Sequence, residues 1–213
     1  MHLAFLHTGD VHVARFDAVL DTLAPQTTRR HHVAPELLER ARRNGIDASR
    51  AETIAILQGL ASADAVICSC STLGPLTDEA AAHHPHIIRI DRPMMDAACA
   101  HGARVLVALC LESTREATMA VLDECAARQG ITISPQVVIA SNAWTAFEAG
   151  NMADYADEIA AAIRQSIAQQ PADCIVLAQA SMDVAAEKLT DLGVPVLTSP
   201  RAAVQHALAI AAE

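Results

Sequence analysis

The nine residues DAVICSCST, Asp64 to Thr72, decide the fold, because they recur in altered form as DCIVLAQAS, Asp173 to Ser181. Each copy opens with an acidic residue, continues as a short apolar run and ends in small or polar residues. An apolar run of this length that is bounded by turn residues predicts a buried β-strand. The first copy delivers Cys70 to the carboxyl end of its strand, and the second delivers Gln179 to the corresponding position, each six residues after the acidic residue.

Two further pairs of segments extend the repeat over most of the chain. FDAVLDTL, Phe16 to Leu23, parallels TMAVLDEC, Thr118 to Cys125, and RPMMDAA, Arg92 to Ala98, parallels SPRAAVQHA, Ser199 to Ala207. In the last pair a proline opens a helix after a strand, where its missing N–H costs nothing. We therefore expect two α/β lobes, residues 1–98 and 99–213, with the C-terminal helix able to pack across onto the first lobe.

Apolar runs of strand length alternate with segments of helical spacing. The runs are His2 to Leu6, Thr28 to Val33, Ala65 to Ser69, Ile87 to Ile90, Arg104 to Leu109, Thr132 to Ile139, Cys174 to Ala178 and Val194 to Leu197. The helical segments between them include Ala14 to Leu23, Pro35 to Arg43, Arg50 to Leu60 and Glu112 to Arg128. This alternation predicts an α/β fold of two pseudo-symmetric Rossmann-like lobes, each a four-stranded parallel sheet flanked by helices. A pseudo-twofold axis would bring Cys70 and Gln179 face to face across a cleft between the lobes, at the carboxyl strand ends where ligands usually bind.

The composition argues against several classes of protein. A hydrophobic share of 52% over 213 residues is enough for a sizeable core, and a formal net charge of −10 argues against nucleic acid as a partner. No positively charged start with an apolar run follows Met1, and no apolar stretch approaches the roughly 20 residues of a membrane span. We expect a soluble, cytoplasmic protein with no membrane partner.

The six cysteines lack the spacing of a disulfide framework, so we expect them to be reduced in a cytosol. Cys70 and Cys110 come at the ends of predicted strands. The others fall inside apolar strand or helix patterns, where a free cysteine packs as a small hydrophobe: Cys68, Cys99, Cys125 and Cys174.

Cys70 has the setting of a reactive thiol. The partial positive charge of a helix N-terminus can lower the pKa of a thiol from about 8.5 toward neutrality. Backbone N–H groups and the hydroxyls of Ser71 and Thr72 could hold a substrate carboxylate, and the same donors could stabilise an enediolate. The alternative is that Cys70 is a small turn residue and that the two hydroxyls merely cap the following helix.

The corresponding turn of the second lobe contains Gln179, Ala180 and Ser181. We expect Gln179 to face the cleft as a hydrogen-bond donor to substrate. Ser181 either caps a helix or holds the other end of the ligand.

The segment HTGDVH, His7 to His12, follows the first predicted strand. Its His7, Asp10 and His12 could suggest a metal, but their spacing fits no ligand pattern, and we expect no metal. We expect this loop to border the cleft, with His7 or Thr8 touching substrate, whereas His31 and His32 are expected to be structural. Because GxGxxG and GxSxG are absent, neither a dinucleotide cofactor nor a serine-hydrolase elbow is predicted.

The two-lobed repeat, the CST turn at Cys70 and the second turn in DCIVLAQASM resemble the aspartate/glutamate/hydantoin racemase superfamily, which includes arylmalonate decarboxylase and maleate cis-trans isomerase. The similarity runs from LAFLHTGD through FDAVL to VPVLTSPR. It implies a cofactor-independent enzyme of amino acid metabolism that acts on a small carboxylate, an amino or dicarboxylic acid. A homodimer is common in the family and is the partner that the resemblance implies. Members of the family typically use two cysteines, one from each lobe, on opposite faces of the carbon next to the carboxylate.

One departure from this pattern changes the expected chemistry. Cys70 stands where the first cysteine is expected, but Gln179 occupies the place of the second. Glutamine has no proton to give near neutral pH, because its amide can only donate or accept hydrogen bonds. We therefore predict a one-cysteine variant of the racemase or isomerase type. The alternatives are a single-cysteine decarboxylase and a catalytically reduced protein that binds a small carboxylate.

Overall fold

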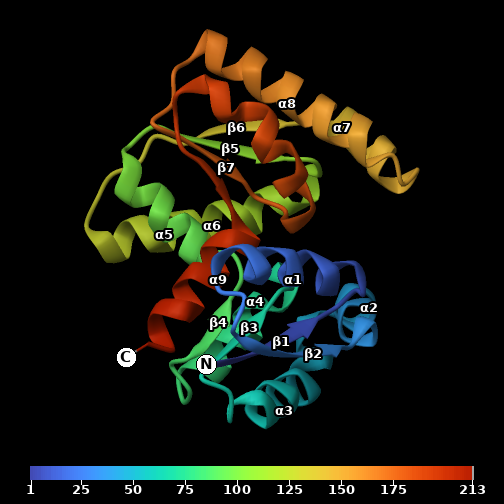
Figure 1. Cartoon of the computed structure of the whole chain (residues 1–213). Helices are drawn as coiled ribbons and strands as arrows, with labels where there is room; N and C mark the ends of the chain where they lie inside the picture. Colours follow the sequence, from blue (N-terminus) through green and yellow to red (C-terminus); the bar gives the residue numbers. More distant parts are fainter. Residues whose placement is uncertain (213) are drawn as a thin grey trace. The chain divides into compact units, whose positions relative to one another are not determined.

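Two four-stranded parallel sheets organise the chain in the computed structural model, which describes residues 1–212 (Figure 1). Their strand orders are β2-β1-β3-β4 and β6-β5-β7-β8, so the two sheets correspond strand by strand. The strands are β1 (His2–His7), β2 (Thr28–Val33), β3 (Ala65–Cys68), β4 (Ile87–Arg89), β5 (Val105–Leu109), β6 (Gln136–Ile139), β7 (Cys174–Leu177) and β8 (Val196–Thr198). This architecture confirms the predicted pair of α/β sheets.

Helices connect successive strands in both halves. The α-helices are α1 (Val11–Leu23), α2 (Pro35–Asn44), α3 (Arg50–Leu60), α4 (Gly74–Ala81), α5 (Arg92–His101), α6 (Arg115–Gln129), α7 (Ser141–Glu148), α8 (Met152–Gln169) and α9 (Ser199–Ile210). The 3₁₀ helices are η1 (Ile46–Ser49), η2 (Ser71–Leu73), η3 (Glu112–Thr114) and η4 (Ala180–Leu192). None of the helices in residues 1–212 is both long enough and apolar enough to cross a membrane.

The chain divides into two compact units. The first unit comprises Met1–Pro93 together with the segment from Pro200 onward, and the second comprises Met94–Ser199. The lobe boundary that the sequence predicted, after residue 98, lies inside α5.

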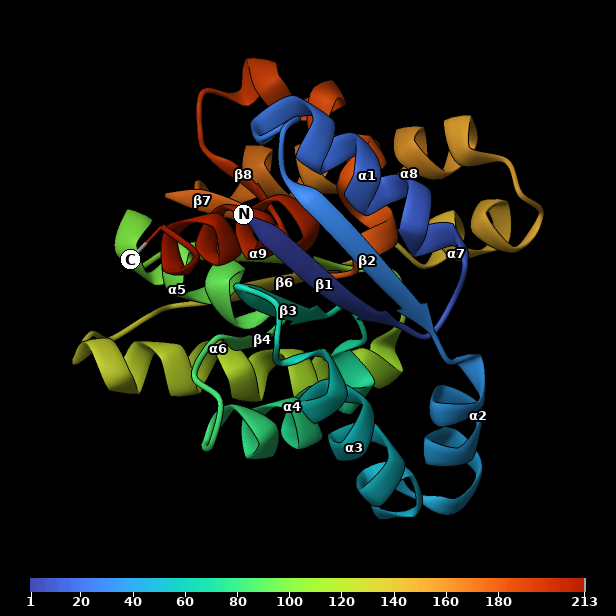
Figure 2. The same ribbon diagram turned by 60° about the horizontal axis from the view of Figure 1, so that its bottom comes forward.

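In the first unit, α1 covers one face of the sheet and α3 and α4 cover the other (Figures 1 and 2). Side chains alternate along β1 and β3, so Leu6 and Cys68 pack with the helices of the second face, whereas Phe5 meets Phe16 of α1. Both central strands are buried on both sides, which explains why they read as continuous apolar runs.

The second unit repeats this plan. Residues of α8 and η4 pack against Leu106, Ala108 and Leu177 on one face of the sheet, and α6 covers the other (Figure 1). The register is equivalent in the two units, because Leu6 pairs with Cys68 as Ala108 pairs with Leu177.

The two acidic residues that open the repeat have the same task. Asp64 accepts a hydrogen bond from the backbone N–H of His2, where β1 begins, at 2.7 Å. Asp173 accepts one from the backbone N–H of Arg104, just before β5, at 2.9 Å. Each carboxylate thus satisfies a backbone donor at the start of the neighbouring strand, which gives a physical reason for its place in the repeat.

The strand bounds differ most from prediction before β6. The predicted strand Thr132 to Ile139 is reduced to Gln136–Ile139. Pro135 has no N–H to contribute to a sheet ladder, so the ladder starts after it. By contrast, β2 and α3 begin and end at the predicted residues.

A buried ion-pair network lies beside the start of α4. The guanidinium of Arg89, which is 7% exposed, donates to Asp91 at 2.6 and 2.9 Å and to Asp78 at 2.6 Å. Arg92 donates to the same Asp78 at 2.8 Å. Gly74 leaves the space that the guanidinium fills, because a Cβ at this position would lie within 2.9 Å of Arg89 Nε and closer still to Cζ and Nη2.

We predict that Gly74→Ala lowers the free energy of unfolding by about 2 to 4 kcal/mol, because displacing Arg89 disrupts a buried charge network that outweighs the helix propensity gained. The matched control is Gly59→Ala in α3, where a Cβ meets nothing within 4 Å. This control should stabilise the protein by about 0.5 to 1 kcal/mol. Urea denaturation measures both changes, and equal effects of the two substitutions would contradict the prediction.

Candidate functional site

Cys70 lies just beyond the carboxyl end of β3, at the start of η2. Its backbone is extended, with φ −104° and ψ 107°, and its carbonyl accepts the N–H of Leu73 at 3.0 Å. The side chain packs with Leu73 and Leu76 and is 7% exposed, the largest value among the six cysteines. Cys70 therefore lies where the sequence predicts it, between the end of a strand and the start of a helix.

The hydroxyl residues that follow Cys70 do not cap the helix. Ser71 and Thr72 are both exposed, and the cap position of α4 is Leu73, which makes no side-chain capping bond. The capping alternative for these two residues is therefore not what the structure forms. Both residues belong to η2, which leads directly into α4, and the first N–H groups of a helix favour an anion.

Gln179 occupies the same local position in the second unit. It too is extended, with φ −107° and ψ 137°, and its carbonyl accepts the N–H of Met182 at 2.9 Å, as η4 begins. Its side-chain oxygen Oε1 accepts the backbone N–H of Cys110 at 2.7 Å. This bond fixes which end of the amide is which, so the NH₂ group is left to donate to another acceptor.

Three further side chains join Gln179 in a hydrogen-bonded network. The thiol of Cys110, which follows β5, lies 3.5 Å from the hydroxyl of Tyr155 on α8, and that hydroxyl lies 2.8 Å from Ser181 Oγ. Ser181 therefore bonds a side chain rather than capping η4, and the neighbouring Ala180 is half-buried. The sequence marks Cys110 as a strand end, but nothing in it indicates that Tyr155 reaches the same place.

His7 has a different environment from the one expected. It is fully buried, and its ring nitrogens lie 2.7 Å from Ser69 Oγ and 2.8 Å from His31 Nδ1. Burial, followed by the charges of His31 and His12, lowers the pKa of His7 to about 3. It is therefore neutral at pH 7, and a contact with substrate would require one of its two bonds to break.

Thr8 and Asp10 continue the loop after His7. Thr8 is half-buried and Asp10 is exposed. A contact between Thr8 and substrate stays a prediction, as does the placing of Cys70 opposite Gln179. Within residues 1–212, no three or more His, Cys, Asp and Glu side chains form a group that could hold a metal ion.

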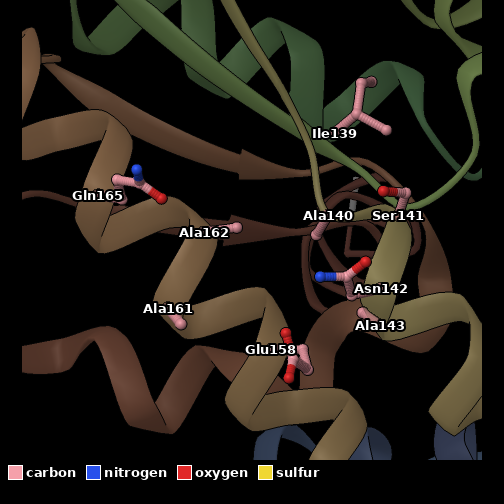
Figure 3. Close-up of a pocket in the computed structure, with 9 residues that line it drawn as sticks. All are labelled: Ile139, Ala140, Ser141, Asn142, Ala143, Glu158, Ala161, Ala162 and Gln165. Carbon is pink, nitrogen blue, oxygen red and sulfur yellow. The ribbon is translucent and has the colours of Figure 1, made fainter.

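A separate pocket of about 260 Å³ lies in the second unit beyond the carboxyl end of β6 (Figure 3). Ser141 and Asn142 of α7 and Glu158 and Gln165 of α8 supply its polar groups. None of the residues that the sequence singles out as a site lines this pocket.

Comparison with known proteins identifies the fold. A family model described as Asp/Glu/Hydantoin racemase matches residues 12–207. Aspartate racemase from Picrophilus torridus is 15% identical, with a TM-score of 0.69, over 99% of this chain and 94% of that one. Allantoin racemase from Klebsiella pneumoniae is also 15% identical, with a TM-score of 0.72, over 100% of this chain and 88% of that one. Arylmalonate decarboxylase is 18% identical, with a TM-score of 0.65, over 99% and 92% of the two chains. None of the curated proteins matches the sequence at a significant level.

We predict that iodoacetamide modifies Cys70 first at neutral pH. Cys70 is the most exposed of the six thiols, and burial raises the pKa of Cys68 to about 12 and that of Cys174 to about 11. Burial also raises the pKa of Cys99 and Cys110, so these four thiols supply less of the reactive thiolate. Peptide mapping after partial labelling measures the order. Earlier modification of Cys99, Cys125 or Cys174 in the folded protein would reverse the assignment.

Proposed function

The chain belongs to the Asp/Glu/hydantoin racemase family, and we propose that it is an enzyme that acts on a small carboxylate through the Cys70 thiolate, without a cofactor. The observation that carries this proposal is the position of Cys70, at a strand end and directly before η2 and α4. The residues that follow Cys70 open η2 and α4, and the first N–H groups of a helix favour a bound anion.

The proposed reaction begins with binding of the substrate carboxylate. The N–H groups at the start of η2 and the hydroxyls of Ser71 and Thr72 donate to its oxygens, since neither hydroxyl is used to cap α4. The Cys70 thiolate then removes a proton from the adjacent carbon. The same donors stabilise the enediolate that forms, because negative charge moves onto the oxygens that they already hold.

In this proposal Gln179 takes the part of a hydrogen-bond donor. With Oε1 held by Cys110, its NH₂ group can donate to a substrate oxygen. It supplies no proton to the substrate carbon. A thiol that both removes and returns the proton acts on one face of the carbon, so exchange with solvent is favoured over inversion.

Two reactions fit a single thiol of this kind. Isomerisation or proton exchange follows if the substrate loses only its proton, and decarboxylation follows if a malonate-type substrate loses CO₂ and the Cys70 thiol protonates the resulting enediolate. Decarboxylation is the second candidate, because Gln179 removes the partner needed for inversion but not the donors needed for an enediolate. We further propose a cytoplasmic location, in keeping with six free cysteines.

We predict that Cys70→Ala abolishes turnover, whereas Cys99→Ala, which removes a buried thiol elsewhere, leaves it within about twofold. A positioned acid or base typically contributes about 10² to 10⁴ in rate, so at least this range should be lost. Deuterium incorporation from D₂O and release of CO₂ are measured over a panel of amino, hydroxy and malonic acids. Ligand-induced stabilisation of the wild type without exchange or product would mean that the protein binds carboxylates and does not transform them.

We predict that Gln179→Cys creates or raises racemisation, because it adds a second thiol at the place that the family uses for one. Gln165→Cys adds a thiol to an exposed position of the same unit and should have no effect. Gln179→Glu keeps an acceptor for Cys110 but replaces the NH₂ donor by an anion, so it should weaken substrate binding at least tenfold. Chiral analysis of the product measures racemisation by the Gln179→Cys and Gln165→Cys variants. Efficient racemisation by the wild type would contradict the one-thiol mechanism.

A further inference from the structure

We propose that Ser69, His7, His31 and Asp17 form a positioning network that holds the end of β3 and thereby presents the Cys70 thiol. The inference rests on the function proposed for Cys70. The network lies entirely within the first unit and joins three elements, α1, β1 and β2, to the residue that follows β3.

The network is a continuous chain of polar contacts. Ser69 Oγ lies 2.7 Å from His7 Nδ1, His7 Nε2 lies 2.8 Å from His31 Nδ1, and His31 Nε2 lies 3.3 Å from Asp17 Oδ1. Ser69 is 4% exposed and His7 is fully buried, whereas Asp17 reaches the surface with 39% of its side chain exposed. The series of polar contacts therefore runs from Asp17 at the surface to Ser69, the residue that precedes Cys70.

The carboxylate at one end favours one direction for the two hydrogen bonds. Asp17 Oδ1 lies 3.3 Å from His31 Nε2 without forming a hydrogen bond, but its negative charge favours a proton on that nitrogen, which leaves Nδ1 of neutral His31 as an acceptor. His7 must then donate from Nε2, so its Nδ1 accepts the hydroxyl proton of Ser69.

Aromatic packing keeps both imidazoles in place and neutral. The ring of Phe5 stacks on His31 at 4.8 Å and Phe16 lies 5.4 Å from His7, both between ring centroids. Burial lowers the pKa of His7, His31 and His12, the last of which stacks on His7 at 6.1 Å. The other charged groups that face the network are Arg29, which donates to Asp17 at 3.1 Å, and Arg15 beside His12.

The network acts on Cys70 through the backbone. Successive side chains of a strand point to opposite faces, so Ser69 is held from the face of α1 while Cys70 packs on the other face with Leu73. Fixing the Ser69 side chain fixes the peptide that joins it to Cys70. The thiol then stays beside the N–H groups of η2 that we propose as its electrostatic partners.

The first test compares two buried serines. Ser69→Ala removes the end of the network, and Ser49→Ala removes a fully buried hydroxyl of the same unit that donates to the Leu37 carbonyl at 2.8 Å. We expect Ser69→Ala to lower the rate of Cys70 alkylation by about 3- to 10-fold, the effect of losing one hydrogen bond, and Ser49→Ala to change it by less than twofold. An unchanged or faster rate in Ser69→Ala overturns the proposal.

The second test compares the two carboxylates that pair with Arg29. Asp17→Ala removes the anchor of His31, whereas Asp21→Ala removes only the partner of Arg29 Nη2 at 2.6 Å. We expect Asp17→Ala to slow Cys70 alkylation about threefold or more and Asp21→Ala to leave it within twofold. Equal effects of the two substitutions overturn the proposal.

A measurement on the wild type keeps the proposal falsifiable if a variant does not fold. Nitrogen-15 NMR at pH 7 distinguishes the two imidazole tautomers, and both His7 and His31 should carry the proton on Nε2. A proton on His7 Nδ1 overturns the proposed order. Alkylation of the wild type separates this inference from the proposed function: an unreactive Cys70 defeats the function, whereas a reactive Cys70 that is indifferent to Ser69 and Asp17 defeats only the network.

Discussion

The hydrogen bond from the Leu73 N–H to the Cys70 carbonyl, at 3.0 Å, is the constraint on which the candidate site depends. It turns the chain from β3 into η2, so Cys70 is extended while the 3₁₀ helix begins at the next residue. The bond from Met182 to Gln179, at 2.9 Å, does the same after β7. Cys70 and Gln179 take the same position because, in a parallel α/β sheet, the chain passes from the carboxyl end of each strand into a helix that covers the sheet. What differs between them is the side chain placed there.

The sequence alone predicts the two strands and the residues at their carboxyl ends. The repeated acidic residue, apolar run and turn predicted β3 and β7 because buried central strands read as continuous apolar runs, and they also predicted Cys70 and Gln179 at corresponding ends. The polar contacts around these strand ends could not be predicted from the sequence. His31 stands in an edge strand and Tyr155 in a long helix, and only the tertiary fold brings their polar atoms to the strand ends. Periodicity shows which face a side chain occupies, but not which polar partner it meets there.

The two units tie together the same pair of strand ends by different chemistry. In the first unit the tie is a side-chain bond between His7, at the end of β1, and Ser69, just after β3. In the second unit the backbone N–H of Cys110, just after β5, donates to the side chain of Gln179, two residues after β7. Buried polar groups at a strand end need partners, and each unit meets this need with the residues that it has.

This difference bears on why the two positions are chemically unequal. In the first unit the tie uses the side chain of Ser69, the residue before Cys70, so the Cys70 thiol is not part of it. In the second unit the tie uses Gln179 itself, because its Oε1 accepts the backbone N–H of Cys110. A thiol at residue 179 would be a weak acceptor for that N–H. The glutamine therefore has a structural task, since it joins the turn after β7 to the backbone of Cys110, and the NH₂ group of its amide can donate to another acceptor. With a cysteine at residue 179, the Cys110 N–H would need another acceptor. Replacing the glutamine by cysteine therefore alters the hydrogen bonding at the end of β7 as well as the chemistry that residue 179 can perform.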